Sequence, residues 1–176
     1  MTLKGNGQSV KGSNESEQLP LIKVHLSTQK LHLFTASGET VYSISSAKNG
    51  AGQNSGSGCT PLGRHYIRAK IGQDMPVNTV FKGRRPTGEL YSAKLAEIFP
   101  ERDWILTRIL WLSGRELGYN RLGKVDSMRR YIYIHGTPDS EPMGEPLSHG
   151  CIRMRNIDLV ALFDMTSVGT DVLIFP

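Results

Sequence analysis

The chain has 176 residues, of which 38% are hydrophobic and 21% are charged, and this composition excludes an intrinsically disordered chain and suits one core-forming domain. Its net charge is +5, but the basic residues form no longer cluster than the pairs Arg84-Arg85 and Arg129-Arg130. No apolar run approaches the ~20 residues that a membrane span needs. We therefore expect neither nucleic acid nor a membrane as a partner.

Residues 1–19 are predicted to be a flexible polar tail, because they are rich in Gly, Ser, Asn and Glu. This segment lacks the apolar core of a signal peptide, so we expect the protein in the cytoplasm. A periplasmic location is the alternative, if a leader was removed from the natural N-terminus. Residues 20–176 are predicted to form one domain, because the sequence shows no internal repeat and no linker.

Alternation of apolar and polar residues predicts several strands in the first half of the domain. Residues 22–26, 30–35 and 40–46 are three such segments, joined by tight turns, as in a β-meander. The glycine-rich stretch 47–59 is predicted to be a loop, since it has no dinucleotide-binding or phosphate-binding spacing. Another strand is expected over residues 67–71.

The second half of the domain contains both helical and strand patterns. Ser92–Phe99 is predicted to be a short helix with one apolar face. Ile105–Leu112 is apolar on both faces, as in a central buried strand. Tyr131–Ile134 is a strand of β-forming residues, Asn156 is predicted to cap a second helix, and Val172–Phe175 is the last strand. These elements predict a mainly β domain with one or two short helices.

The segment 131–156 carries the residues with candidate chemistry. A predicted strand delivers His135, and His149 lies two residues before Cys151, with Gly150 between them. A thiol nucleophile requires such a setting, because an imidazole can accept the thiol proton and a glycine leaves room for a substrate carbonyl. Either histidine could be the general base. A loop can fold His135 back to the cysteine, and His149 shares a face with Cys151 in an extended segment.

The neighbours of Cys151 indicate how a substrate could be held. The backbone amides of Gly150 and Cys151 are candidate donors of an oxyanion hole. Arg153 lies on the same face as Cys151 in an extended segment, and its planar guanidinium suits a substrate carboxylate, although a structural ion pair is equally compatible with the sequence. Only one other cysteine exists, Cys59, so we expect two free thiols, with Cys59 incidental to the chemistry.

A zinc site is an alternative interpretation of the same residues. His135, His149 and Cys151 could supply three ligands and leave a fourth position open. The sequence contains neither HExxH nor CxxC, and no acidic residue is an obvious partner of these three. We therefore expect no metal and no other cofactor.

The residues His135-Gly136 and Ser148-His149-Gly150-Cys151-Ile152-Arg153 resemble the signature of the L,D-transpeptidase catalytic domain (YkuD) family. That signature is His-Gly, a spacer, then Ser or Thr followed by His-Gly-Cys, a hydrophobic residue and Arg or Asn. Residues 60–63, Thr-Pro-Leu-Gly, are similar to a Thr-Pro-x-Gly turn upstream in that family. The resemblance covers residues 21–176 and implies an open β-sandwich or barrel that catalyses cysteine acyl transfer on peptidoglycan stem peptides.

The resemblance also implies a role for each signature residue. Cys151 corresponds to the nucleophile and His135 to the general base, which Gly136 would orient through its backbone carbonyl. The pocket and its oxyanion hole would be shaped by Ser148, His149 and Gly150. Arg153 would bind substrate carboxylates.

The acceptor decides which reaction such an enzyme catalyses. Water gives an L,D-carboxypeptidase, which releases the terminal D-Ala from a muropeptide tetrapeptide, and the amine of a second stem gives a 3–3 crosslink. Because the cytoplasm holds no wall to crosslink, the expected location favours an L,D-carboxypeptidase of muropeptide recycling, with a wall-crosslinking L,D-transpeptidase as the alternative. A non-catalytic peptidoglycan-binding or zinc-binding module is a weaker alternative, since such a module does not need an intact Cys151 and His135. The expected partners are stem peptides or muropeptides, and the sequence predicts no oligomeric state.

Overall fold

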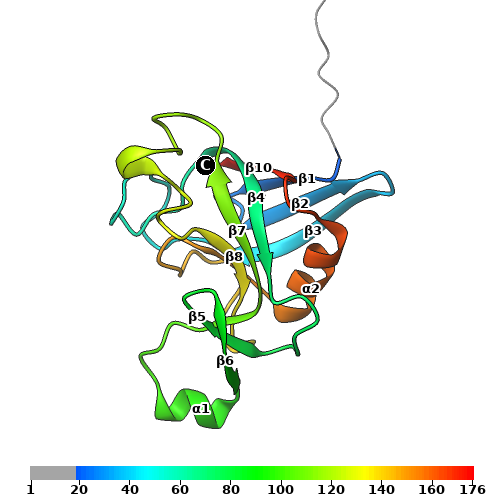
Figure 1. The fold of residues 1–176 in the computed structure, drawn as a ribbon, viewed down its shortest axis with the longest axis vertical. Helices are drawn as coiled ribbons and strands as arrows, with labels where there is room; N and C mark the ends of the chain where they lie inside the picture. The colour runs from blue at the N-terminus through cyan, green and yellow to red at the C-terminus, as the bar shows by residue number, and fades with distance from the viewer. Residues whose placement is uncertain (1–18) are drawn as a thin grey trace, which may run out of the picture.

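Strands that are far apart in the sequence lie side by side in one curled sheet (Figure 1). The computed structural model describes residues 19–176, so the predicted polar tail lies outside the described residues except for Leu19. The sheet contains ten strands: β1 (Leu21–His25), β2 (Lys30–Thr35), β3 (Gly38–Ser45), β4 (Gly63–Ile71), β5 (Thr79–Lys82), β6 (Arg85–Leu90), β7 (Ile105–Gly114), β8 (Tyr133–Gly136), β9 (Ile152–Met154) and β10 (Asp171–Phe175).

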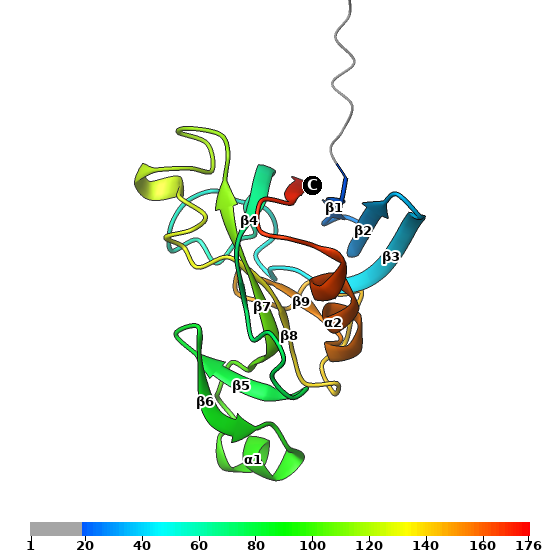
Figure 2. The same ribbon diagram turned by 45° about the vertical axis from the view of Figure 1, so that its right-hand side comes forward.

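The sheet closes on itself because β4 pairs with β10 on one side and with β7 on the other. The strand order is β4-β10-β1-β2-β3-β9-β8-β7-β5-β6, with the additional pairing β4–β7. Eight strands therefore form a barrel-like ring, and the β5–β6 hairpin extends beyond it from β7 (Figure 2). The predicted mainly β fold of sandwich or barrel type is confirmed.

The interior of the ring is filled by side chains that alternate along the strands. Ile22 and Val24 of β1, and Leu31 and Leu33 of β2, have no exposed surface. This is the period of two that the sequence shows, since successive side chains of a strand point to opposite faces. The antiparallel β1–β2–β3 meander follows the order that the sequence predicts, and β10 joins it by pairing in parallel with β1.

The strand β7 connects the barrel to the β5–β6 extension. It pairs with β4, β5 and β8, and its residues Leu106, Ile109 and Leu110 are fully buried, as predicted for a central strand. Its register against β8 shifts between Leu106 and Ile109, where Thr107 adopts a φ of 70°. A bulge of this kind bends the strand and lets it contact both the ring and the extension.

The second helix, α2 (Asn156–Met165), packs against the barrel core. Its residues Leu159, Leu162 and Phe163 are fully buried in the same cluster as the strand side chains. The ammonium of Lys70 on β4 donates to the carbonyl oxygens of Phe163 and Thr166 at 2.5 and 2.6 Å. A cation at a helix C-terminus satisfies carbonyls that have no partner within the helix.

The prediction that Asn156 caps this helix was wrong. The N-cap position is Arg155, and its side chain makes no capping bond. Asn156 is buried, and its amide nitrogen donates to the carbonyl oxygen of Thr137 at 2.9 Å, while its oxygen accepts from the hydroxyl of Thr107 at 2.6 Å. Buried polar groups need such partners, so the asparagine joins α2 to β7 and to the segment after β8.

The first helix, α1 (Ala93–Ile98), covers the β5–β6 extension instead of the barrel (Figure 2). Ser92 caps it by accepting from the backbone N–H of Leu95 at 3.2 Å. Leu95 packs on the small cluster around Trp104, but Ile98 is 60% exposed, so the predicted apolar face is only partly buried. Neither helix, in the part of the chain that the structure describes, is long and apolar enough to cross a membrane.

The strand that delivers His135 begins two residues later than the sequence predicts. Tyr131 lies in a turn with a φ of 57°, and β8 runs from Tyr133 to Gly136. His135 and Gly136 therefore lie within the strand, where ladder pairing fixes their backbone.

Candidate active site

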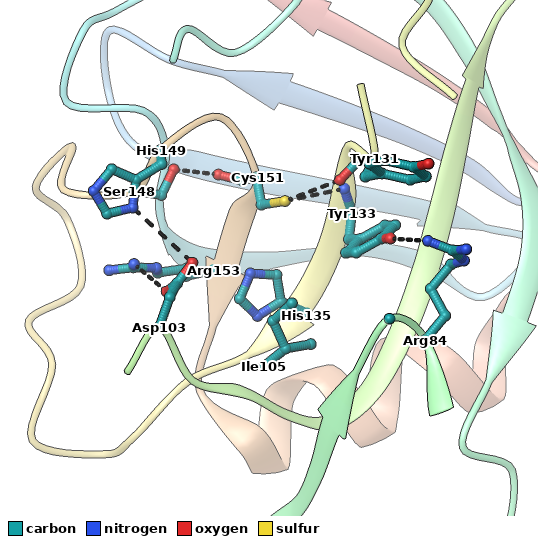
Figure 3. A pocket seen from close by; sticks show the side chains of 11 residues that line it. Arg84, Asp103, Ile105, Tyr131, Tyr133, His135, Ser148, His149, Cys151 and Arg153 are labelled. Carbon is teal, nitrogen blue, oxygen red and sulfur yellow. Dashed lines mark hydrogen bonds and ion pairs between the residues drawn. The ribbon is translucent and has the colours of Figure 1, made fainter. Parts of the chain in front are cut away.

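A cavity of about 530 Å³ opens beside the strands β8 and β9 (Figure 3). It brings together most of the side chains that the sequence singled out. Gly136 and Gly150 do not line it and act only through their backbone. The lining residues are Gly83, Arg84, Asp103, Ile105, Tyr131, Tyr133, His135, Ser148, His149, Cys151 and Arg153.

Parallel pairing of β8 with β9 places the cysteine next to the strand that carries the histidine. His135 is opposite Arg153 in the register. Cys151, which directly precedes β9, therefore lies beside Tyr133. The backbone N–H of Tyr133 donates to the sulfur of Cys151 at 3.4 Å, and the thiol donates to the carbonyl oxygen of Tyr131 at the same distance. The sulfur is thus held on the side of the cavity that the two tyrosines line.

The turn before Cys151 depends on a glycine and on two hydroxyl groups. Gly150 has a φ of 136°, which favours glycine. The hydroxyl of Thr60 donates to the carbonyl oxygen of Gly150 at 3.0 Å, which ties the predicted Thr-Pro-Leu-Gly turn to the site. Ser148 donates to the carbonyl oxygen of Cys151 and accepts from the N–H of Gly150. The Gly150 amide is thus engaged by Ser148, and of the two amides predicted as oxyanion donors the one of Cys151 stays the candidate.

The thiol of Cys151 is neutral at neutral pH. Burial raises its pKa to about 12, and the backbone N–H of Tyr133 acts in the opposite direction. The carboxylate of Asp103 raises the pKa as well, while the cations Arg153 and Arg130 lower it without cancelling the effect of burial. The resting protein therefore holds a thiol, and any reaction at this sulfur would need a base to remove its proton.

His135 is placed to be that base. It is 1% exposed, and burial lowers its pKa below the ordinary value of 6.5, although the carbonyl of Gly136 and the carboxylate of Asp103 act against this. Its Nδ1 lies 2.8 Å from the carbonyl oxygen of Gly136. Since a carbonyl only accepts, Nδ1 carries the hydrogen, and Nε2 has the free lone pair that a base needs.

The structure separates the two histidines that the sequence left equivalent. The side chain of His149 is 82% exposed, and its Nδ1 lies 4.0 Å from a carboxylate oxygen of Asp103. It stands at the rim of the cavity, whereas His135 is enclosed in its wall between Ile105 and Cys151 (Figure 3). The burial and the fixed tautomer of His135 favour it as the base.

Arg153 lines the cavity, but its charge already has partners. Its guanidinium lies 2.8 Å from a carboxylate oxygen of Asp103 and 3.8 Å from one of Glu141, and its side chain is 9% exposed. The ion pair that the sequence allowed as an alternative is therefore present. Binding of a substrate carboxylate by Arg153 stays a prediction, and such a carboxylate would compete with Asp103.

Sequence reasoning missed four polar side chains that line the cavity. Tyr131 and Tyr133 were interpreted only as β-forming residues, although they alternate with His135 at the spacing of one strand face. That alternation was a usable signal. Asp103 and Arg84 come from segments well outside the signature, and no local pattern in the sequence connects them to it.

The described part of the chain contains neither a metal-binding group nor a disulfide. Within residues 19–176, no three side chains of His, Cys, Asp or Glu form a group that could hold a metal ion. Cys59 and Cys151 are both free, as expected. The thiol of Cys59 donates to the carbonyl oxygen of Asn49 at 3.3 Å, in the glycine-rich loop.

The fold is that of solved L,D-transpeptidases. A crystal structure of the L,D-transpeptidase (residues 123–326) of Xylanimonas cellulosilytica superposes with a TM-score of 0.55 at 18% identity, over 88% of this chain and 59% of that one. L,D-transpeptidase 3 of Mycobacterium tuberculosis, in complex with a faropenem-derived adduct, superposes with a TM-score of 0.56 at 15% identity, over 89% of this chain and 60% of that one. At these identities the likeness concerns the fold alone.

The chain belongs to the L,D-transpeptidase catalytic domain (YkuD) family, which matches residues 20–174. YqjB of Bacillus subtilis (strain 168), which is named as an L,D-transpeptidase, is 43% identical over 63 residues, covering 36% of this chain and 34% of YqjB. YbiS of Escherichia coli (strain K12), named likewise, is 46% identical over 43 residues, covering 24% of this chain and 14% of YbiS. The matches thus span about a third or less of these relatives.

Proposed function

We propose that this protein is a cysteine-dependent enzyme that cleaves the L,D peptide bond of peptidoglycan stem peptides and releases the terminal D-Ala of a tetrapeptide. Family membership supports the substrate class. The observation that carries the proposal is the joint placement of Cys151 and His135 in one cavity, with the histidine tautomer set by Gly136. These are the nucleophile, the base and the group that orients the base, as acyl transfer requires.

Acylation starts from the neutral thiol of Cys151 and the neutral imidazole of His135. The sulfur of Cys151 attacks the carbonyl carbon of the third stem residue while Nε2 of His135 takes the thiol proton. A tetrahedral oxyanion forms, for which the Cys151 amide is the candidate donor. The imidazolium then gives its proton to the leaving nitrogen, the C–N bond breaks, and D-Ala departs from a thioester on Cys151.

Deacylation repeats the same proton transfers with an acceptor. His135 takes a proton from water or an amine as the acceptor attacks the thioester, and it returns a proton to the sulfur as the C–S bond breaks. Water yields a tripeptide, and the amine of a second stem yields a 3–3 crosslink. The first candidate is the L,D-carboxypeptidase reaction, because water needs no binding site of its own. A cytoplasmic role in muropeptide recycling is part of this first candidate.

A second cavity favours crosslinking as the second candidate. It measures about 460 Å³ and shares Tyr131 and His149 with the cavity of Cys151. Its other walls are the glycine-rich loop and the segment on both sides of Tyr131, contributed by Ser55, Gly56, Gly58, Arg129, Arg130 and Ile132. A cavity next to the thioester is where an amine acceptor would need to bind.

Product analysis tests the function and separates the candidates. A disaccharide tetrapeptide is incubated with the protein, with and without an amine acceptor, and the products are weighed by mass spectrometry. Release of D-Ala with a tripeptide product supports the carboxypeptidase, and an added acceptor mass supports the transpeptidase. Binding without any D-Ala release indicates a non-catalytic module. Release by Cys151→Ala at the wild-type rate would remove the cysteine from the mechanism.

A further inference from the structure

We propose that Arg84 binds a carboxylate of the stem peptide and thereby selects the substrate, an inference that rests on the proposed substrate class. Arg84 belongs to the turn between β5 and β6 and lines the cavity of Cys151. It lies on the opposite side of His135 from the ion pair of Asp103 and Arg153 (Figure 3). The cavity thus has a paired cation at one end and a second cation at the other.

Three contacts hold the guanidinium of Arg84 in place. Its central carbon lies 4.6 Å from the ring centroid of Trp111 and 4.8 Å from that of Tyr131, and its Nη1 donates to the hydroxyl of Tyr133 at 3.0 Å. Its backbone has a φ of 66°, which is uncommon for a residue other than glycine. A long flexible side chain is therefore fixed beside the tyrosines that hold the sulfur of Cys151.

The positive charge of Arg84 is not neutralised within the described chain. Among residues 19–176, no carboxylate oxygen lies within 4.0 Å of its guanidinium, whereas Arg153 has both Asp103 and Glu141. The third cation near the thiol, Arg130, has its hydrogen-bond donors engaged by another part of the chain. Its guanidinium donates to oxygens of the glycine-rich loop, namely those of Gly52, Gln53, Ser57 and Cys59. Arg84 is therefore the cavity arginine that can bind an anion without first breaking an ion pair within the described chain.

A carboxylate is the partner that matches this group. A planar guanidinium offers paired N–H donors in the geometry of a carboxylate, and stacking on aromatic rings leaves its edge free to donate. The half-buried position strengthens the attraction, because water screens it less than at an exposed site. A stem tetrapeptide presents such a group on a diaminopimelate side chain and at its terminal D-Ala.

Binding measurements on the inert Cys151→Ala protein test the proposal with intact peptides. Three stems are compared: one with diaminopimelate and a free D-Ala, one with lysine in place of diaminopimelate, and one with an amidated D-Ala. Adding Arg84→Ala should weaken binding of the first stem about tenfold, the value of a charge-assisted hydrogen bond. The same substitution should leave unchanged the affinity for the stem that lacks the carboxylate bound by Arg84. An unchanged affinity for the lysine stem would identify the diaminopimelate carboxylate, and an unchanged affinity for the amidated stem would identify that of D-Ala.

Three further variants control for structure and charge. Arg84→Gln keeps a planar amide over the rings without the charge and should bind the first stem as weakly as Arg84→Ala. Arg84→Lys should lose less affinity than either. Arg68→Ala removes an exposed arginine whose guanidinium lies 5.7 Å from the same Trp111 ring but outside the cavity, and it should leave the affinity within twofold. Thermal melting confirms that each variant is folded.

The outcomes distinguish failure of this inference from failure of the proposed reaction. D-Ala release is measured separately with Cys151 intact. If no D-Ala is released and the Arg84-dependent difference between stems persists, the reaction is wrong and the role of Arg84 stands. An equal effect of Arg84→Ala on all three stems, no effect on any, or no binding of any stem by Cys151→Ala would overturn the role of Arg84.

Discussion

Nδ1 of His135 donates to the carbonyl oxygen of its own neighbour Gly136, at 2.8 Å. Both residues lie in β8, where pairing with β7 and β9 holds the backbone, so the acceptor cannot turn away from the ring. The group that would orient the proposed base is thus built into the strand, without a separate carboxylate.

The two histidines should differ sharply in their effect on acylation. His135→Ala should lower the rate of thioester formation by a factor of about 10² to 10⁴, since it removes the proposed general base. His149→Ala should lower it far less, because that ring is 82% exposed at the rim. Intact-protein mass spectrometry of the acyl-enzyme on Cys151, sampled over time, measures both rates. A larger loss with His149→Ala would reverse the assignment.

The pH dependences of kcat/KM and of thiol alkylation should both indicate that Cys151 and His135 are uncharged at neutral pH. Burial lowers the pKa of His135, so the base stays active on acidification until the pH falls below its ordinary value of 6.5. The acid limb of kcat/KM should therefore lie below about pH 6.5. Burial raises the pKa of Cys151 to about 12, so alkylation by iodoacetamide should be slow at neutral pH and should accelerate throughout the alkaline range. A Cys59→Ser background removes the other thiol, and a plateau of alkylation near neutral pH would contradict the assignment.

Asp103→Asn should shift the acid limb to lower pH. The carboxylate of Asp103 raises the pKa of His135, so its neutral amide would leave the imidazole easier to deprotonate. The carboxylate of Asp103 also raises the pKa of the Cys151 thiol, so its removal should make alkylation faster at a given pH. Glu141→Gln removes the more distant carboxylate of Arg153, 3.8 Å away, and serves as the control for loss of an acidic partner. An unchanged limb with Asp103→Asn would show that this charge does not act on the base.

Gly136→Ala should damage both stability and activity. An added Cβ would collide with the side-chain oxygen of Asn156 and would lie 2.7 Å from the carbonyl oxygen of Leu106. Relief of these contacts must move β7 or α2, at an expected loss of about 2 kcal/mol or more in the free energy of unfolding. Gly118→Ala is the control, since its Cβ meets no atom within 4 Å and only the backbone strain of a φ of 73° remains, about 1 kcal/mol. Urea unfolding of both variants measures the difference.

The buried histidine His65 should make the fold sensitive to acid. Its Nε2 lies 2.8 Å from the hydroxyl of Ser127, and burial lowers its pKa to about 4. The unfolded chain, with a histidine pKa of about 6.5, binds this proton first, so stability present at pH 7 is lost as the pH falls through the interval between the two values. The loss from this residue between pH 7 and pH 5 should be about 2 kcal/mol. Urea unfolding at both pH values should show a smaller difference in His65→Gln than in the wild type.

Short-range patterns were sufficient for most of the strands. The period of two between residues 22 and 35 predicted β1 and β2, because side-chain alternation is a property of each strand alone. The start of β8 and the role of Asn156 were mispredicted for a different reason. Both depend on partners that are distant in the sequence, such as Thr107 on β7, whose hydroxyl bonds the asparagine.

The sequence alone determined the mainly β class, the family and the presence of a glycine-flanked cysteine with two histidines, since each of these is encoded in adjacent or regularly spaced residues. Only the tertiary structure decided which histidine is enclosed, which carboxylate neutralises Arg153, and that Arg84 faces the same cavity. The physical reason is that the charge state of a group depends on its burial and on the charges within a few ångströms. Closure of the barrel and folding of the β5–β6 hairpin bring those charges from segments that are remote along the chain.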